Sequence, residues 1–339
     1  MNDILKDALY CKIPLKFKDN GKFKILMISD IHGGKGYAAD LTVRDIDAIV
    51  ELEKPDLVIM GGDIAGPGYI HVETEEDLRM LLDGVASPME KRNIPWAHVY
   101  GNHDDNFGLE NAVQQKIYET YPHCVSKAGP EDIDGVGNYF LPVYDNKGEK
   151  ILFGVYGLDS HSGVGDYEKY FGITEKHQYF HAGANTSGGY DGAHFDQVMW
   201  YYNTSKEVEN YAGAKVPSLM YMHIPTPEHA LVTTHKNKVK FSGYHLEDVA
   251  CNIVNFGLFG ACLQRGDVKG IFCGHEHENN FCGTYCGIKL GYDGHMSYHA
   301  CHNDEVRGGR VFEIDANNPS ELNTYLVKAK DAVKALENK

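Results

Sequence analysis

The stretch "FKILMISDIHGG", residues 23–34, combines the two patterns that decide the fold of this chain. Its first seven residues form a short run rich in aliphatic side chains, which is typical of a strand buried on both faces. Asp30 and His32 follow directly, and the glycines behind them indicate a loop. We therefore predict a buried strand whose carboxyl end carries polar side chains.

The same arrangement continues along the next hundred residues. "DLVIM" (56–60) and "PWAHVY" (95–100) are further apolar runs of strand length. Residues 40–53 place apolar side chains along one broad helical face, and "TEEDLRMLLDGVAS" (74–87) opens with Thr74, a good N-cap. The alternation predicts β-α-β units with at least partly parallel pairing.

The second half of the chain contains more strand-like segments, at residues 150–160, 217–225 and 268–277. "FCGTYCGIKLGYD" (281–293) and "GGRVFEIDA" (308–316) then follow without an obvious helix between them. These segments predict a second, more antiparallel sheet. Two sheets packed face to face with helices outside are the simplest α/β architecture for this order of elements.

Residues 161–215 differ in composition from the rest of the chain. They are rich in Gly, Tyr and His before an amphipathic stretch around "FDQVMWYYNTSKEVENY". Segments of this length are usually lids or insertions. We expect one domain, residues 1–339, with an insertion or lid at about 161–215; whether its Tyr and His residues contact substrate or only pack stays open.

Composition limits the classes of partner and site. The chain has 339 residues, 42% of them hydrophobic, and a net charge of −16, which disfavours nucleic acid as a partner. No segment has the length of a membrane span and no signal peptide is visible, so we expect a cytoplasmic protein. Cys282 and Cys286 have a spacing that zinc could use, but free thiols are favoured because no second pair accompanies them.

Nearly every predicted strand ends in a side chain that can bind a metal ion. Each of these residues alone is more often a turn former or a solvated side chain than a ligand. Ligands gather at the carboxyl ends of strands in α/β sheets, so the five strand ends together predict one site. The residues are Asp30 and His32; Asp63; Asn102, His103 and Asp104; His223; and His275 and His277.

The mixture of ligand types indicates the class of metal. Carboxylates, imidazoles and one amide oxygen suit Zn²⁺, Mn²⁺ or Fe²⁺, whereas calcium prefers oxygen almost throughout. One aspartate can bridge two ions through its two oxygens. Two such ions would keep the site positive and able to hold a phosphate in an otherwise acidic protein.

The blocks "DIH", "GGDI", "GNHD", "MH" and "GHEH", in this order over residues 30–277, resemble the signature of calcineurin-like metallophosphoesterases. "GLDSH" at 157–161 and "HIPTPEH" at 223–229 resemble the branch related to purple acid phosphatases. The resemblance implies a four-layer αββα sandwich of two mixed β-sheets flanked by helices. It also implies a dinuclear metal centre and hydrolysis of a phosphate ester by a hydroxide that bridges the two metals.

The resemblance also assigns roles to residues of this chain. One metal would be held by Asp30, His32, Asp63 and His277, and the other by Asp63, Asn102, His223 and His275, with Asp63 bridging. His103 would stabilise the transition state or protonate the leaving oxygen, and Asp104 would orient His103. Asn102 and His103 would then also contact the substrate.

One position departs from the purple acid phosphatases. They carry a tyrosine ligand three residues after the bridging aspartate, and here that position is Gly66, while His32 also differs from their pattern. Two divalent ions (Mn, Fe or Zn) are therefore expected rather than a ferric site.

Other residues and functions remain open at this point. Asp159 and His161 end a predicted strand, where lining a substrate pocket and forming a turn are equally plausible. Asn279 and Asn280 are expected to bond the backbone rather than substrate. We expect a phosphomonoesterase acting on a small phosphorylated molecule; the alternatives are a phosphodiesterase or nucleotide pyrophosphatase and, less favoured, a catalytically inactive scaffold.

Overall fold

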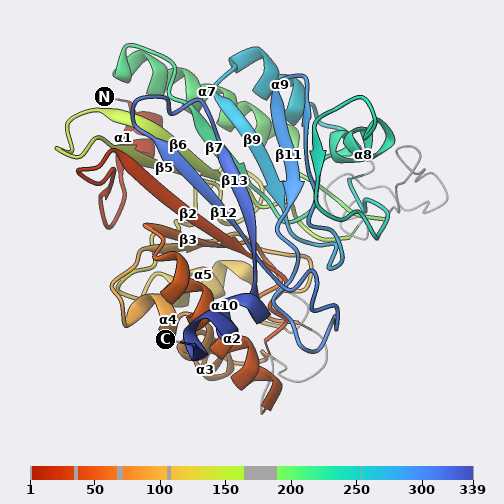
Figure 1. Cartoon of the computed structure of the whole chain (residues 1–339). Helices are drawn as coiled ribbons and strands as arrows, with labels where there is room; N and C mark the ends of the chain where they lie inside the picture. The colour runs from red at the N-terminus through yellow and green to blue at the C-terminus, as the bar shows by residue number, and fades with distance from the viewer. Residues whose placement is uncertain are drawn as a thin grey trace.

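Two β-sheets pack face to face between two layers of helices, as the ribbon in Figure 1 shows. This computed structural model confirms the predicted four-layer α/β architecture. Both ends of the chain lie outside the sheets, on opposite halves of the molecule. The structure describes residues 2–33, 37–66, 72–104, 108–163, 189–252 and 254–338.

The first sheet contains the strands predicted around the opening stretch. Its order is β13-β12-β2-β3-β4, and β2, β3 and β4 run parallel as expected. The segment 308–316 was wrongly placed in the second sheet, because β12 pairs antiparallel with β2 instead. The bounds are β2 Lys22–Ile28, β3 Leu57–Met60, β4 Trp96–His98, β12 Gly308–Asp315 and β13 Asn323–Lys328.

The second sheet has the order β1-β5-β6-β7-β9-β11-β10-β8 within the described residues. Its middle strands β6, β7, β9 and β11 are parallel, so the expected antiparallel character is confined to the flanking pairs β5/β6, β10/β11 and β8/β10. The bounds are β1 Leu15–Lys16, β5 Tyr139–Tyr144, β6 Ile151–Gly157, β7 Ser218–Tyr221, β8 Phe241–Ser242, β9 Val268–Cys273, β10 Cys282–Tyr285 and β11 Ile288–Tyr292.

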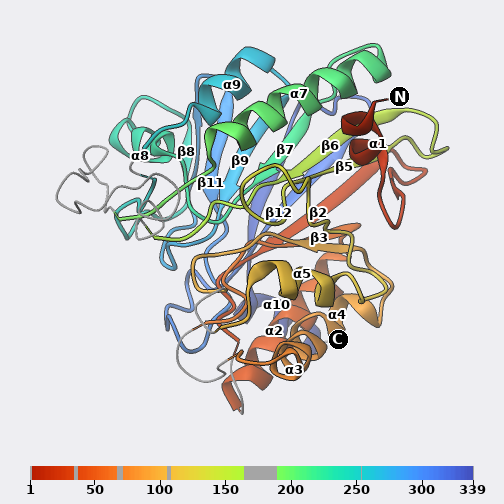
Figure 2. The ribbon, with the colours of Figure 1, turned by 180° about the vertical axis from the view of Figure 1, so that it is seen from behind.

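Helices cover the outer face of each sheet, which Figure 2 shows from behind. Thr74 caps one of them as predicted, since its hydroxyl accepts from the backbone of Asp77. On the first sheet lie α2 Tyr37–Glu53, α3 Glu75–Val85, α4 Ser87–Glu90, α5 Asn111–Tyr118 and α10 Ala329–Glu337; on the second lie α1 Asp3–Leu9, α7 Phe195–Ala212, α8 Pro227–Thr234 and α9 Leu258–Arg265.

The opening stretch is apolar on both faces because both faces of strand β2 are buried. Phe23, Ile25 and Met27 pack into the core between the two sheets, whereas Leu26 and Ile28 pack under the helices. All five side chains are at most 1% exposed. This burial, worth roughly 1.5–3 kcal/mol per large apolar side chain, holds the strand rigidly beneath the loop that carries Asp30.

Residues 164–188, the larger part of the predicted insertion, lie outside the described residues. The described remainder is an isolated bridge between Gly163 and Tyr190 and the helix α7, which matches the amphipathic stretch. The single-domain boundary thus stays a prediction. In the described part of the chain, none of the helices combines the length and the apolar character that crossing a bilayer would require.

Candidate metal centre

The loops after the strands hold their polar residues in an unusual backbone conformation. Asp30, His32, Asp63 and His275 have φ angles of 49°, 45°, 49° and 80°. Side chains other than glycine rarely adopt this left-handed region, and each such residue costs of order 1–3 kcal/mol. Four strained residues, three after strands of the first sheet and His275 after β9 of the second, indicate that the surrounding core holds these loops for a purpose other than stability.

A first cluster joins the two sheets at that edge. Asp30 follows β2 in the first sheet and His277 follows β9 in the second, yet Asp30 Oδ1 and His277 Nε2 are 3.4 Å apart. His32 Nε2 lies 3.0 Å from His277 Nε2 and 3.9 Å from Asp30 Oδ1. Atoms that bind the same ion, each at about 2.0–2.2 Å from it, lie at similar distances from one another.

A second cluster contains Asp63 and His223. His223 Nδ1 donates to the carbonyl of Gly61 at 2.8 Å, so Nε2 faces Asp63 Oδ2, 3.2 Å away. Burial acts to lower the pKa of His223, but the carboxylates of Asp63 and Asp30 outweigh it and raise the pKa to about 10. The pair of carboxylates therefore requires positive charge at Nε2, which a proton or a metal ion can supply.

The remaining predicted ligands surround the same point. Asn102 lines the same pocket as Asp63, His275 and His277, and the His275 ring packs edge-on against His223 at a centroid distance of 5.2 Å. His275 Nε2 is buried without a hydrogen-bond partner among the described residues. Asp63 Oδ1 accepts from the backbone of His103 at 2.8 Å, which brings His103 to the same edge. All seven predicted metal ligands thus converge.

Two glycines allow this convergence. A Cβ at Gly101 would lie 2.1 Å from Asp63 Oδ1, and a Cβ at Gly66 would lie 2.0 Å from the Nδ1 of His32. The His32 ring therefore fills the space in which a side chain at position 66 would begin. This explains physically why His32 and Gly66 occur together, and why the tyrosine of the purple acid phosphatases has no room here.

Asp104 bonds the backbone of the loop that carries Asp63. Its Oδ1 accepts from the backbone amides of Ile64 and Ala65 at 2.9 Å, and its Oδ2 accepts from Asp63 and Gly101 at 2.9 and 2.8 Å. A buried carboxylate with four such bonds fixes the loop that carries Asp63. The predicted orienting role of Asp104 toward His103 stays a prediction.

Asp159 and His161 lie beside the centre rather than facing the pocket described below. Asp159 accepts from the backbone amides of Val136 and His161, and His161 Nε2 lies 3.0 Å from Gln197 Oε1. Both residues are buried. These contacts favour a structural role over the predicted substrate contact. Asn279 and Asn280 accept from backbone amides of Tyr244, Leu246 and Glu247, so they bond backbone as expected, although of a neighbouring loop rather than of the double-histidine turn.

His161 also belongs to a second group of His and Asp residues. Its ring stacks on His194 with centroids 4.0 Å apart and an 18° interplanar angle. His194 lies between the carboxylates of Asp191 and Asp134, each 2.9 Å from one of its nitrogens. Stacked imidazoles cannot both direct an in-plane lone pair at one ion, so we interpret this group as a hydrogen-bonded network.

The network predicts a pH dependence of stability. Burial acts to lower the pKa of His194, but its bonds to Asp191 and Asp134 outweigh burial and raise the pKa above 6.5. A raised pKa contributes stability below pH 6.5 that is lost as the pH rises through the folded-state value. In urea unfolding at pH 6 and pH 9, His194→Gln should therefore lose less free energy of unfolding with rising pH than the parent; equal losses would contradict this assignment.

A pocket of about 300 Å³ opens onto the centre. His275 contacts the ring of Tyr190 at a centroid distance of 4.3 Å. Tyr190 belongs to the Tyr- and His-rich segment whose contact with substrate the sequence left open. Sequence reasoning missed Glu247 and Asp248, because nothing in their local sequence sets them apart from surface residues. The lining residues are Asp63, Asn102, His103, Tyr190, Glu247, Asp248, Ala250, His275, Glu276 and His277.

Comparisons with known proteins agree with this geometry. Two relatives from Arabidopsis thaliana are named probable inactive purple acid phosphatases 14 and 29. The match to the first is 32% identical and spans 84% of this chain and 73% of the relative. The match to the second is 30% identical and spans 96% of this chain and 85% of the relative. The crystal structure of a dimetal phosphatase from Danio rerio is 14% identical, covers 86% of this chain and 92% of its own, and shares the fold with a TM-score of 0.58.

The family match covers most of the sequence, from residue 23 to residue 279. It spans every block from which the resemblance was inferred, from Asp30 to His277. Fold, ligand clusters and sequence therefore agree that the chain belongs to the calcineurin-like phosphoesterase family.

Proposed function

We propose that this chain hydrolyses phosphate monoesters of small molecules with two divalent ions, of Mn, Fe or Zn. Metal-dependent hydrolysis of phosphoesters is the chemistry of the family. Asp30, His32, Asp63 and His277 would hold one ion, and Asp63, Asn102, His223 and His275 the other. When bound, the two ions would acidify a water to give a nucleophile near neutral pH and offset the charge of the phosphate.

The observation that carries the proposal is the arrangement of imidazole nitrogens around two buried carboxylates. Burial acts to raise the pKa of Asp30, but the imidazoles of His277 and His223 outweigh it and hold the pKa well below 3.8. His32 has its pKa lowered to about 4 by burial, against the pull of Asp63 and Asp30. A neutral His32 beside ionised aspartates is a ready metal ligand.

The other residues of the site bind and orient the substrate. His103 lines the pocket and would stabilise the transition state or give a proton to the leaving oxygen, as a positioned imidazole does in general acid catalysis. Its backbone amide donates to Asp63 Oδ1, which holds this residue beside the carboxylate that would bridge the two ions. Asp104 keeps that arrangement constant by holding the amides of the Asp63 loop.

Two other functions have some support. A phosphodiesterase or pyrophosphatase would use the same centre, behind the same pocket of about 300 Å³. An inactive scaffold is suggested by the names of the two plant relatives. The convergence of all seven candidate ligands with His103 argues against it, because a chain that no longer needs metal has no reason to keep four strained backbone positions.

The test compares p-nitrophenyl phosphate with bis(p-nitrophenyl) phosphate after loading the protein with Mn²⁺ or Zn²⁺. We expect turnover of both, with the monoester hydrolysed faster. Faster turnover of the diester would reverse the ranking of the two activities. No turnover of either ester by protein that has bound two ions would support the inactive scaffold.

A further inference from the structure

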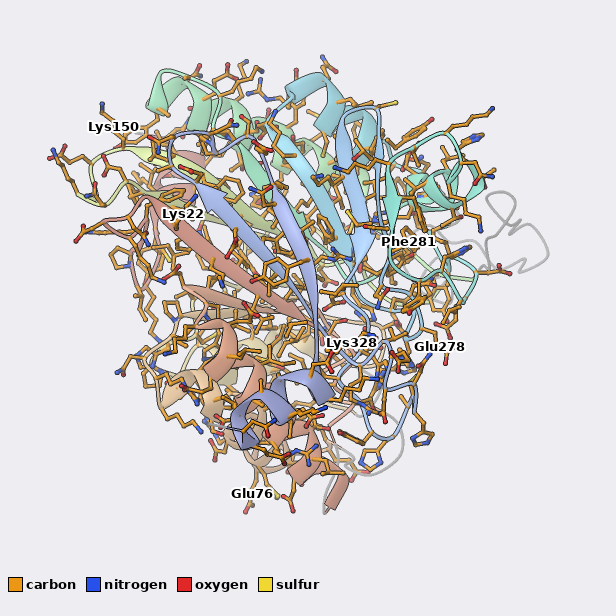
Figure 3. All side chains as sticks on the ribbon, in the orientation of Figure 1. Lys22, Glu76, Lys150, Glu278, Phe281 and Lys328 are labelled. Carbon is orange, nitrogen blue, oxygen red and sulfur yellow. The ribbon has the colours of Figure 1, made fainter. Side chains whose placement is uncertain are left out.

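Two strands from different sheets bring a hydroxyl and a carboxyl group together beneath the metal centre. Strand β2 begins at Lys22, labelled in Figure 3, and Ser29 follows its other end. Strand β11 ends at Tyr292, whose backbone amide donates to the carbonyl of Phe281, also labelled in Figure 3, and Asp293 comes next. Ser29 Oγ and Asp293 Oδ1 lie 2.8 Å apart, and both residues are completely buried.

Ser29 also contacts one of the proposed metal ligands. Its Oγ lies 2.5 Å from Oδ2 of Asp30, and a Cβ at Gly274 would lie 2.6 Å from both of these atoms, so position 274 has to be glycine for the contact to form. The backbone amide of His275 is shared by the two Asp30 oxygens at 3.0 and 3.2 Å. Oδ1 faces the imidazoles, with His277 Nε2 at 3.4 Å. Ser29 therefore bonds Oδ2 and leaves Oδ1 directed at the proposed ion.

The number of hydrogens in this chain of groups calls for one more than the serine supplies. A hydroxyl has a single hydrogen to donate, yet Ser29 Oγ lies within bonding distance of the carboxyl oxygens of Asp30 and Asp293, and 3.4 Å from the carbonyl of Gly294. If both carboxyl groups were ionised, one of them would face the serine oxygen with no hydrogen between them. Asp30 is held ionised by the imidazoles beside it, so the additional hydrogen belongs on Asp293.

The surroundings of Asp293 favour the same protonation state. Burial raises the pKa of Asp293 well above 3.8 and the charge of Asp30 adds to this, against the contact with Ser29 and the charge of Arg310. Among the described residues, the guanidinium of Arg310 donates to two backbone carbonyls and one threonine hydroxyl, and none of these bonds reaches Asp293. A carboxyl group without a directly paired cation is more stable neutral than ionised in such a position.

We propose that Asp293 is a positioning residue of the metal centre: its protonated carboxyl group donates to Ser29 Oγ, and the Ser29 hydrogen then goes to Asp30 Oδ2, which keeps Asp30 Oδ1 directed at the first ion. The first ion is the one that Asp30, His32, Asp63 and His277 would hold. The proposal rests on the proposed function, which makes Asp30 a metal ligand. It adds Ser29 and Asp293 as residues that touch no ion and yet set the affinity for one of the two.

Calorimetric titration of the metal-free protein with Mn²⁺ measures the affinity of both ions without requiring turnover. Ser29→Ala should raise one of the two dissociation constants by about 10–100-fold, the usual effect of losing a hydrogen bond to a metal ligand. The other constant should stay as in the parent, because Asp30 is not a ligand of the proposed second ion. Two unchanged constants, or an equal rise of both, would overturn the proposal.

Two changes of Asp293 separate its hydrogen bond from its charge. Asparagine has nearly the same shape, is neutral and can donate to Ser29, so Asp293→Asn should keep both constants of the parent. Leucine cannot donate, so Asp293→Leu should raise the same constant as Ser29→Ala. An equal rise in the asparagine and leucine variants would show that position 293 needs a charge, and would overturn the proposal. Ser29→Ala removes one atom only and tests the hydrogen-bonded chain even if the leucine variant does not fold.

A double variant tests whether Asp293 acts through Ser29. Ser29→Ala/Asp293→Leu should bind Mn²⁺ as Ser29→Ala does, because residues of one hydrogen-bonded chain do not contribute additively; additive losses would contradict the proposal. The matched control is Ser218→Ala, another completely buried serine, at the start of β7, which should leave both constants unchanged. Failure of the proposed function is seen separately, as absent hydrolysis of p-nitrophenyl phosphate by parent protein that has bound two ions.

Discussion

Asp63→Asn is expected to lower hydrolysis of p-nitrophenyl phosphate by about a thousandfold, which corresponds to about 4 kcal/mol of barrier. Asp63 Oδ2 lies 3.2 Å from His223 Nε2 and 3.7 Å from His32 Nε2, and so faces ligands of both proposed ions. Asparagine keeps the shape but removes the charge and one of the two ligand oxygens. Bound metal, measured by mass spectrometry of the dialysed protein, should fall below two ions per chain.

The control for this change is Asp132→Asn, which alters an exposed aspartate away from the centre. It should keep both the metal content and the rate of the parent. If Asp63→Asn retained two ions and the parental rate, Asp63 would not bridge the ions and the assignment of both ligand sets would be wrong.

His103→Asn should separate catalysis from metal binding. We expect kcat to fall by about a hundred- to ten-thousandfold, the usual contribution of a positioned acid or base, while the protein keeps two ions. The reason is that His103 lines the pocket, its backbone amide donates to Asp63, and its ring packs edge-on against His32 at 5.5 Å. The proposed ligand sets do not include its imidazole.

His235→Asn, at the end of α8 and outside the pocket, provides the matched control and should leave kcat unchanged. Full activity of the His103→Asn protein with both ions present would exclude His103 from the chemistry. Loss of the ions would show instead that the imidazole is a ligand.

Strand β2 shows what the sequence could predict. Its apolar run, its parallel partners β3 and β4 and the polar residues at their carboxyl ends are local patterns, and rigid parallel strands bring such ends to one edge. The nine polar residues of the site, the seven candidate ligands with His103 and Asp104, could therefore be named from strand ends alone. The assignment of the ligands to two ions came from the family resemblance and remains to be measured.

What could not be predicted depends on long-range contacts. The pairing of β12 with β2 joins residues almost 300 positions apart, and no local sequence pattern indicates which sheet a strand belongs to. Asp104 bonds backbone amides near Asp63, which carry no signal in the side-chain sequence. Tyr190 and Glu247 reach the pocket on loops, where position is set by tertiary packing rather than by periodicity.

The two-ion centre is the central claim, and a metal titration tests it most directly. Protein stripped with a chelator and dialysed should be inactive toward p-nitrophenyl phosphate, and activity should be followed as Mn²⁺ or Zn²⁺ is added back. Two ions per chain should bind, with hydrolysis rising chiefly as the second site fills. Full activity without metal, or saturation of both binding and hydrolysis at one ion per chain, would contradict the account.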